Sequence, residues 1–262
     1  MKWRYLPILL SLWVCAGCQK VIHVNLNEAE PKIVIEGIAF EGTDTVSVRI
    51  TKTGNYFGDD PIAIIDDAQV SIREENNAPI SIPNVGNGYY KLPAYTAIAG
   101  KKYHLEVIAE GQQFTSSSYL PYPVAIDSFR SEFKPKQGFR DEGFEVSVFF
   151  TDPDSTPNFY RLIYSINDTL RNEPRDLMVF NDKYNNGNVV RINFFERFQE
   201  NDSLHFELRG MDEALYLYFS SLSTALGSGA SPAPANPVSN IKGGALGYFG
   251  VFTQSKKHLI VK

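Results

Sequence analysis

Apolar residues at every second position are the feature that most constrains how this chain folds, because they recur in short segments along much of its length. Successive side chains of a strand point to opposite faces, so this spacing predicts strands that each bury one face. Clusters of Gly, Asn, Asp and Pro separate the segments and predict turns. The chain is therefore predicted to be mainly β. The segments that show the alternation span residues 33–35, 46–50, 70–72, 103–107, 144–150, 160–166 and 204–208.

A junction rich in proline indicates the domain organisation. Pro121 and Pro123 flank Tyr122, and two prolines this close cannot both continue a central strand. Short strands separated by frequent turns are typical of β-sandwiches, and the hydrophobic content of 43% is enough for a packed core. We expect two consecutive β-sandwich lobes, an N-terminal one over residues 31–120 and a C-terminal one over residues 121–262.

One helix is predicted near residues 212–226, within the C-terminal lobe. Asp212 is suited to cap its start, and Leu215 and Phe219 recur at helical spacing on one face. Gly227 suits the left-handed position that ends a helix. We expect the apolar face to pack on the second sandwich. The alternative, an amphipathic helix on a membrane surface, lacks the lysines and arginines that such helices carry.

A hairpin is predicted where residues 185–188, Asn-Asn-Gly-Asn, lie between the apolar pairs 179–180 and 189–190. Asn-Gly pairs favour the turn types that join two neighbouring antiparallel strands. We therefore expect the two flanking segments to pair with each other.

The start of the chain has the three parts of a secretory signal segment. Lys2 and Arg4 give a basic beginning, residues 5–14 are largely apolar, and small residues come directly before Cys18. The apolar run is shorter than the roughly 20 residues that span a bilayer. The pattern predicts a lipoprotein signal peptide over residues 1–17, cut before Cys18, which would then carry a lipid anchor with acyl chains such as palmitate.

Two alternatives compete with processing at Cys18. Cleavage before Cys15 would place the bulky Val14 where the peptidase accepts Gly, Ala or Ser, so Cys18 is the better candidate. An ordinary secretory signal, cut after Ala16 or Gly17, stays open. Since these are the only two cysteines of the chain, the mature protein is expected to fold without a disulfide.

The segment after the cleavage box predicts how the protein is held. Residues 18–30 are polar and irregular, and we expect them to form a tether between a membrane and the folded body. The formal net charge of −5 offers no generic attraction to nucleic acid. We expect a lipid anchor in an outer membrane, and either the cell surface, which is favoured, or the periplasmic face stays open.

The sequence offers no constellation for catalysis or metal binding. His23, His104, His205 and His258 each lack a neighbouring His, Cys or carboxylate at metal-ligand spacing, and the second and third alternate with apolar residues, which predicts solvent-facing rings. Residues 152–155, Asp-Pro-Asp-Ser, lack the turn Gly and distal Glu of a calcium loop and predict a turn. Nucleophile-elbow and Walker motifs are absent. We predict a protein that is not an enzyme and binds no cofactor.

Exposed aromatic rings are the remaining route to a binding site. Tyr56 and Phe57 lie in a predicted loop, where rings are able to stack on sugars or fill a protein interface. The alternative is that most aromatic residues complete the two cores.

Part of the first lobe resembles a known kind of exported module. Residues 67–72 (Asp-Ala-Gln-Val-Ser-Ile), 88–90 (Gly-Tyr-Tyr) and 100–107, which begin Gly-Lys-Lys-Tyr, are similar to prealbumin-like or carboxypeptidase-regulatory-like sandwiches. These modules are scaffolds, so the resemblance implies an Ig-like or prealbumin-like sandwich and no particular chemistry.

A second resemblance covers nearly the whole mature chain. It rests on the cleavage box and on residues 29–37, 120–128, 212–214 and 240–249, taken in that order. Together they resemble the Bacteroidota lipoproteins grouped as the domain of unknown function 4249 (DUF4249). The resemblance implies an outer-membrane lipoprotein that is often encoded beside a TonB-dependent transporter, and it carries over no catalytic or ligand-binding residue.

The glycine-rich segment near the end of the chain is predicted to be structural rather than ligand-binding. Glycine suits a tight turn where backbones pack closely, and the phenylalanine that follows suits a core anchor. The residues of this motif are Asn240, Gly243, Gly244, Gly247 and Phe249.

The function expected from these features is that of a non-enzymatic accessory protein at the outer membrane. It would partner a TonB-dependent β-barrel transporter in substrate capture or assembly, because a membrane tether raises the local concentration of a binding module near its partner. The alternative is a freestanding surface adhesin or glycan-binding lipoprotein. A third reading, an envelope hydrolase, is disfavoured by the missing catalytic constellation.

Overall fold

The structure is a computed structural model, and it describes residues 30–42, 45–54, 61–154, 156–194, 196–227 and 236–262. Cys18, Tyr56 and Phe57 lie outside the described residues. In the described part of the chain, no helix is long and apolar enough to cross a membrane.

Most of the described residues lie in strands, interrupted by one α-helix and one short 3-10 helix. The elements are β1 (Ile33–Phe40), β2 (Thr45–Lys52), β3 (Gln69–Glu74), β4 (Ile80–Ser81), β5 (Asn84–Gly86), β6 (Tyr89–Pro93), β7 (Lys102–Ala109), β8 (Gln112–Tyr119), β9 (Ile126–Lys134), β10 (Gly143–Thr151), β11 (Phe159–Ile166), β12 (Thr169–Leu170), η2 (Pro174–Asp176), β13 (Met178–Asn181), β14 (Val189–Asn193), β15 (Ser203–Met211), α2 (Glu213–Gly227) and β16 (Leu246–Ile260).

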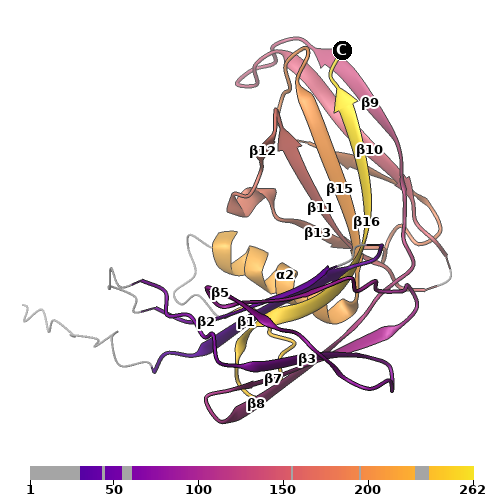
Figure 1. The fold of residues 1–262 in the computed structure, drawn as a ribbon. Coiled ribbons are helices and arrows are strands. Elements are labelled where there is room, and N and C mark those ends of the chain that lie inside the picture. Colours follow the sequence, from indigo (N-terminus) through magenta and orange to yellow (C-terminus); the bar gives the residue numbers. More distant parts are fainter. Residues whose placement is uncertain (1–29, 43–44, 55–60, 155, 195, 228–235) are drawn as a thin grey trace, which may run out of the picture.

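The N-terminal lobe, drawn at the bottom of Figure 1, is a sandwich of two sheets. One contains β1, β2, β6 and β5 together with the first half of β16, and the other has the order β4-β3-β7-β8. Their facing side chains form one core that includes the fully buried Ile35, Tyr90 and Tyr103. The Tyr90 hydroxyl donates a hydrogen bond to the Ile65 carbonyl (3.0 Å) and accepts one from the Ala68 N–H (2.9 Å). Burial of this ring therefore leaves no polar atom without a partner.

The C-terminal lobe is a second sandwich, and it stands above the first in Figure 1. One sheet runs β12-β11-β15-β16, with β13 also paired to β11, and the other has the order β14-β10-β9. The buried residues of the alternating segments, such as Phe150, Leu162 and Phe206, point between these sheets and form the second core.

The last strand, β16, belongs to both lobes. Its first half pairs in parallel with β1, from Leu246 opposite Val34 to Phe252 opposite Phe40. Its second half pairs antiparallel with β15, from Thr253 opposite Gly210 to Ile260 opposite Ser203. The two lobes consequently share one nine-stranded sheet, and β16 is drawn in yellow through both of them in Figure 1.

Helix α2 lies in the angle between the lobes (Figure 1). The Asp212 carboxylate caps it, accepting a hydrogen bond from the Leu215 N–H (3.0 Å), and its other oxygen accepts one from the Tyr119 N–H of β8 (2.8 Å). Leu215 and Phe219 are buried against β15 and β16 in a third, smaller core. The cap thus fixes the helix to both lobes at its first turn.

The predicted fold class is confirmed: the protein is mainly β, with two consecutive sandwich lobes and one helix. The helix expected near 212–226 is α2. The predicted boundary at residue 120 assigns β16 to the C-terminal lobe alone. The N-terminal sandwich also includes residues 241–251, among them Ile241 and Val251 in its core.

The predicted hairpin across residues 185–188 is wrong. β13 pairs with β11, whereas β14 pairs with β10 of the opposite sheet, so the loop between them crosses from one sheet to the other. The Asn-Gly turn still forms locally, because the Asn188 N–H bonds to the Asn185 carbonyl (2.9 Å) and Gly187 has a φ of +74°. β13 and β14 thus face the second core from opposite sheets, with Phe180 on one side and Val190 on the other.

The glycine motif packs against the first sandwich. The Asn240 side chain brackets the backbone of Phe249, accepting from its N–H (2.9 Å) and donating to its carbonyl (2.8 Å). Phe249 is fully buried in the first core. At Gly247, where φ is +95°, a Cβ would overlap the Ile35 carbonyl of the neighbouring strand. Gly244 has a φ of +91° but open space around it.

Gly247→Ala and Gly244→Ala therefore form a matched pair that separates backbone conformation from close packing. Both changes place Cβ at positive φ, which costs about 1–2 kcal/mol. Only Gly247→Ala also forces β1 and β16 apart, so we expect about 2 kcal/mol of additional loss. Equilibrium denaturation in urea measures both losses, and equal losses would contradict the close approach of β16 to β1.

Candidate groove on the C-terminal lobe

The outward face of β11, β15 and β16 carries polar and charged side chains. Because alternate residues of these strands fill the second core, the residues between them point outward. The strand register brings the outward residues into three rows across the sheet. The rows are Arg161, Arg209 and Gln254; then Ile163, Glu207 and Lys256; then Ser165, His205 and His258.

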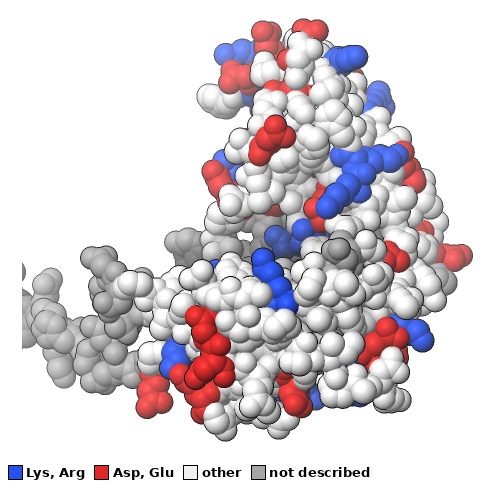
Figure 2. Space-filling view, viewed as in Figure 1, with Lys and Arg blue, Asp and Glu red and all other residues white. Residues whose placement is uncertain are grey.

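Two connected hollows follow this face, and we call them together the groove. The smaller, of about 270 Å³, lies over the His205 and His258 row. The larger, of about 610 Å³, lies where η2 and α2 approach the sheet. Ile163, Leu170 and Glu207 line both hollows. Figure 2 shows Lys and Arg atoms around the hollow region where the two lobes meet.

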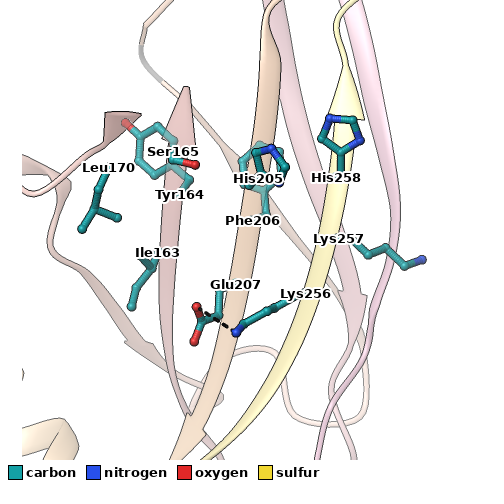
Figure 3. A pocket seen from close by; sticks show the side chains of 10 residues that line it. All are labelled: Ile163, Tyr164, Ser165, Leu170, His205, Phe206, Glu207, Lys256, Lys257 and His258. Carbon is teal, nitrogen blue, oxygen red and sulfur yellow. Dashed lines mark ion pairs between the residues drawn. The ribbon is translucent and has the colours of Figure 1, made fainter. Parts of the chain in front are cut away.

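The two histidines of the smaller hollow lie side by side, as Figure 3 shows. Their ring centroids are 4.6 Å apart, and the Ser203 hydroxyl lies 3.0 Å from His258 Nε2 and 3.4 Å from His205 Nε2. The exposed Asp168 carboxylate lies 3.7 Å from His205 Nε2. Among the residues that the structure describes, no group of three or more His, Cys, Asp or Glu is arranged to hold a metal ion.

Glu207 of the middle row lies between two cations and forms a charge network with them. The Glu207 carboxylate accepts a hydrogen bond from Arg209 Nε (2.6 Å) and lies 4.0 Å from Lys256 Nζ, the ion pair marked in Figure 3. The Glu207 and Arg209 side chains are each less than one-fifth exposed, so water screens this pair less than an ordinary surface pair.

Aromatic rings contact the two arginines of the first row, Arg161 and Arg209. The Arg161 guanidinium lies 4.4 Å from the ring centre of Phe219 on α2, and that of Arg209 lies 4.7 Å from the ring centre of Phe40 on β1. Burial and then the positive charge of Arg209 lower the pKa of Arg161. Cation–π contact partly offsets the cost of holding two like charges on facing positions.

A second carboxylate supports the wall of the larger hollow. Glu196 accepts hydrogen bonds from Arg171 (2.5 Å) and from the Tyr164 hydroxyl (2.5 Å). Burial and the hydrogen bond to Glu196 raise the pKa of Tyr164, so the phenol stays protonated and acts as a donor. These bonds fix the start of the segment that leads into η2.

The histidines and the aspartate singled out from the sequence have different surroundings in the structure. His104 and His205 point away from the cores, as the alternation predicts, but His205 also meets His258, which sequence spacing did not indicate. Asp152 is buried and accepts hydrogen bonds from the Tyr160 hydroxyl (2.5 Å) and the Gly187 N–H (3.3 Å). This carboxylate therefore ties the strand end to the following loop.

A family model described as "Domain of unknown function (DUF4249)" matches residues 19–258. The chain belongs to this family. No curated protein matches the chain. A two-domain fibronectin type III segment from chicken tenascin is similar to this DUF4249 protein at 16% identity and a TM-score of 0.23, over 69% of this chain and 90% of that one. The fold class follows from the strands and their pairing.

The sequence did not predict the groove of this DUF4249 protein, because its residues come from three segments that are far apart along the chain. Only strand register brings Arg161 opposite Arg209 and His205 opposite His258. The one available signal is that polar residues alternate with apolar ones along all three strands. That signal indicates an outward face and does not specify which outward residues meet.

Glu207→Gln tests the charge network of the groove. Without the carboxylate, Arg209 loses its partner and faces Arg161 uncompensated, so we expect a loss of about 1–3 kcal/mol in unfolding free energy. Glu132→Gln is the matched control, because Glu132 also pairs with a cation, Lys134, but is 45% exposed. The control should leave the urea midpoint unchanged, and an equal shift in both variants would contradict the network.

Proposed function

We propose that this DUF4249 protein is a lipid-anchored accessory protein of a Bacteroidota outer membrane, where it helps a TonB-dependent β-barrel transporter capture its substrate or assemble. The proposal combines three supports: the cleavage box before Cys18, the family to which the chain belongs, and the groove. The groove is the observation that carries the binding role.

The groove suits binding because rigid elements build it. Its charged and polar residues stand on paired strands, and the Asp212 cap and the third core fix its α2 wall. Side chains that packing already holds lose little conformational entropy when a ligand arrives. A pre-formed site of this kind binds without first ordering a loop.

The mechanism is tethered capture. A lipid on Cys18, at the start of the predicted tether of residues 18–30, would confine the two lobes to the membrane that also holds the barrel. Confinement raises the effective concentration of the groove at its partner, so contacts that are weak in solution suffice.

A glycan-binding lipoprotein is the second candidate, favoured by exposed aromatic rings. Tyr122, Phe139 and Tyr184 are each at least 70% exposed, and such rings are able to stack on sugars. Replacing these rings with Ala would abolish saccharide binding under this alternative and leave barrel association intact under the first.

Cys18→Ala should release the protein from the membrane fraction, since the lipidated thiol would be lost. Cys15→Ala is the matched control, because it removes the other cysteine of the same segment and should leave anchoring unchanged. Fractionation followed by mass spectrometry of the amino-terminal peptide measures both location and lipid. A Cys18→Ala chain that stays lipidated in the membrane would refute the anchor.

Barrel association is tested by purification from detergent-solubilised membranes. We expect a TonB-dependent transporter to emerge with the wild-type and Cys15→Ala proteins, and its recovery to fall at least about tenfold with Cys18→Ala, because two-dimensional confinement is lost. Repeated recovery of the wild-type protein without any barrel would overturn the proposed partnership while leaving the anchor in place.

A further inference from the structure

The larger hollow of the groove is a cleft lined by both charged and apolar side chains. The sheet contributes Arg161, Glu207 and Arg209, the segment through β12 and η2 contributes charged and apolar residues, and α2 contributes apolar ones. The cleft holds about 610 Å³, within the roughly 300–1,000 Å³ that is typical of small-molecule sites. Its apolar lining consists of Ile163, Leu170, Pro174, Leu177, Leu222 and Leu226.

The three arginines of this cleft differ in whether they form an ion pair with a carboxylate. Arg171 pairs with Glu196 (2.5 Å) and Arg209 with Glu207 (2.6 Å). For Arg161, no carboxylate lies within ion-pair distance among the residues described, and its contact is the Phe219 ring. A guanidinium presents five N–H donors in a fixed plane, and a ring against its face leaves the edge donors directed sideways.

The surroundings of Arg161 make an anion favourable there. Arg209 stands directly opposite on the neighbouring strand, and like charges in that position repel. Burial and the Arg209 charge lower the pKa of Arg161, and the Glu207 charge opposes them only in part. A negative group between the two guanidiniums would offset that cost.

We propose that this cleft binds a small organic acid, with its carboxylate on the Arg161 guanidinium beside Arg209 and its apolar body between the sheet and helix α2.

Charge and shape restrict the ligand class further. Glu173, Asp176 and Glu207 line the same cleft and would repel a ligand with several negative charges, so the site is matched to a single carboxylate. Leu170 of β12, Leu177 directly after η2, and Leu222 and Leu226 of α2 line the cleft, so an apolar body gains from burial at about 25 cal/mol per Å². A bare inorganic anion would use only the arginines.

The inference deepens the proposed function, since it names the substrate class that the tethered groove would capture, and it rests on that function for its biological use. The binding measurement itself needs no partner. Failure to bind an organic acid would leave barrel association standing, and failure to recover a barrel would leave the acid site standing.

The test uses the full chain purified in a non-ionic detergent and the water-soluble probe 3-phenylpropionate. Isothermal titration calorimetry should show binding, with 3-phenylpropanamide, the uncharged isostere, at least about tenfold weaker because the charge-assisted hydrogen bonds are lost. Acetate, which has the carboxylate without the apolar body, should also bind at least about tenfold more weakly. Equal affinity for acid and amide would overturn the role of Arg161.

Two variants test the residues. Arg161→Gln should weaken 3-phenylpropionate binding at least about tenfold while leaving the amide unchanged. Arg175→Gln is the matched control, because this arginine of η2 is exposed, pairs with Glu173 and does not line the cleft, and it should bind like the wild type. Full affinity in Arg161→Gln would refute the site.

Leu226→Glu covers the case in which Arg161→Gln fails to fold. Leu226 is half exposed at the edge of the cleft, so a carboxylate there is tolerated by the fold and competes for Arg161. It should weaken the acid at least about tenfold and the amide much less. An unchanged affinity for 3-phenylpropionate in this variant would also overturn the proposal.

Discussion

The pairing of β16 with both β1 and β15 is the constraint on which the rest of the structure depends. One strand closes the first sheet in parallel and the second sheet in antiparallel register, and the change of partner falls between Phe252 and Thr253. Residues of the same strand reach different cores: Phe249 lies in the first, Phe252 in the third, and Leu259 packs on the second. Hydrogen bonds also reach the facing elements, from the Val251 N–H to Ser118 (3.1 Å) and from the Ile126 N–H to Ser255 (2.9 Å). The lobes are therefore one mechanical unit.

This shared strand also creates the groove. By continuing into the upper sheet, β16 sets Lys256 and His258 beside the outward residues of β15, and β15 leads directly into α2, whose packing on β16 covers the adjacent apolar surface. The larger hollow of the groove thus lies where η2 and α2 approach the shared sheet. Binding there would act on strands of both sandwiches, since Arg209 contacts Phe40 of β1.

The sequence predicts local structure well and pairings between distant strands poorly. Alternation marks the strands, and Asp212 marks the start of α2, because these signals depend on neighbours within a few residues. Gly227 is the last residue of α2 and does not adopt the left-handed conformation expected for it. The hairpin prediction failed because β13 and β14 pair with different strands, β11 and β10, rather than with each other across the Asn-Gly turn. The arginine and histidine pairs were not predictable for the same reason. Each depends on register between strands far apart in sequence, and shifting one strand by a single residue would turn its outward set inward.

The late position of β16 has a consequence for how the chain acquires its structure. β1 and β2 are made early and pair with each other, but the other edge of β1 stays open until residues 246–252 of β16 have been made. An unpaired edge with alternating apolar residues is a template for pairing with another chain. Long-range closure of this kind also slows folding. A polypeptide that stops before Leu246 would keep that edge of β1 exposed. Incomplete chains of this protein are therefore prone to aggregate, and pairing of β16 with β1 removes the exposed edge.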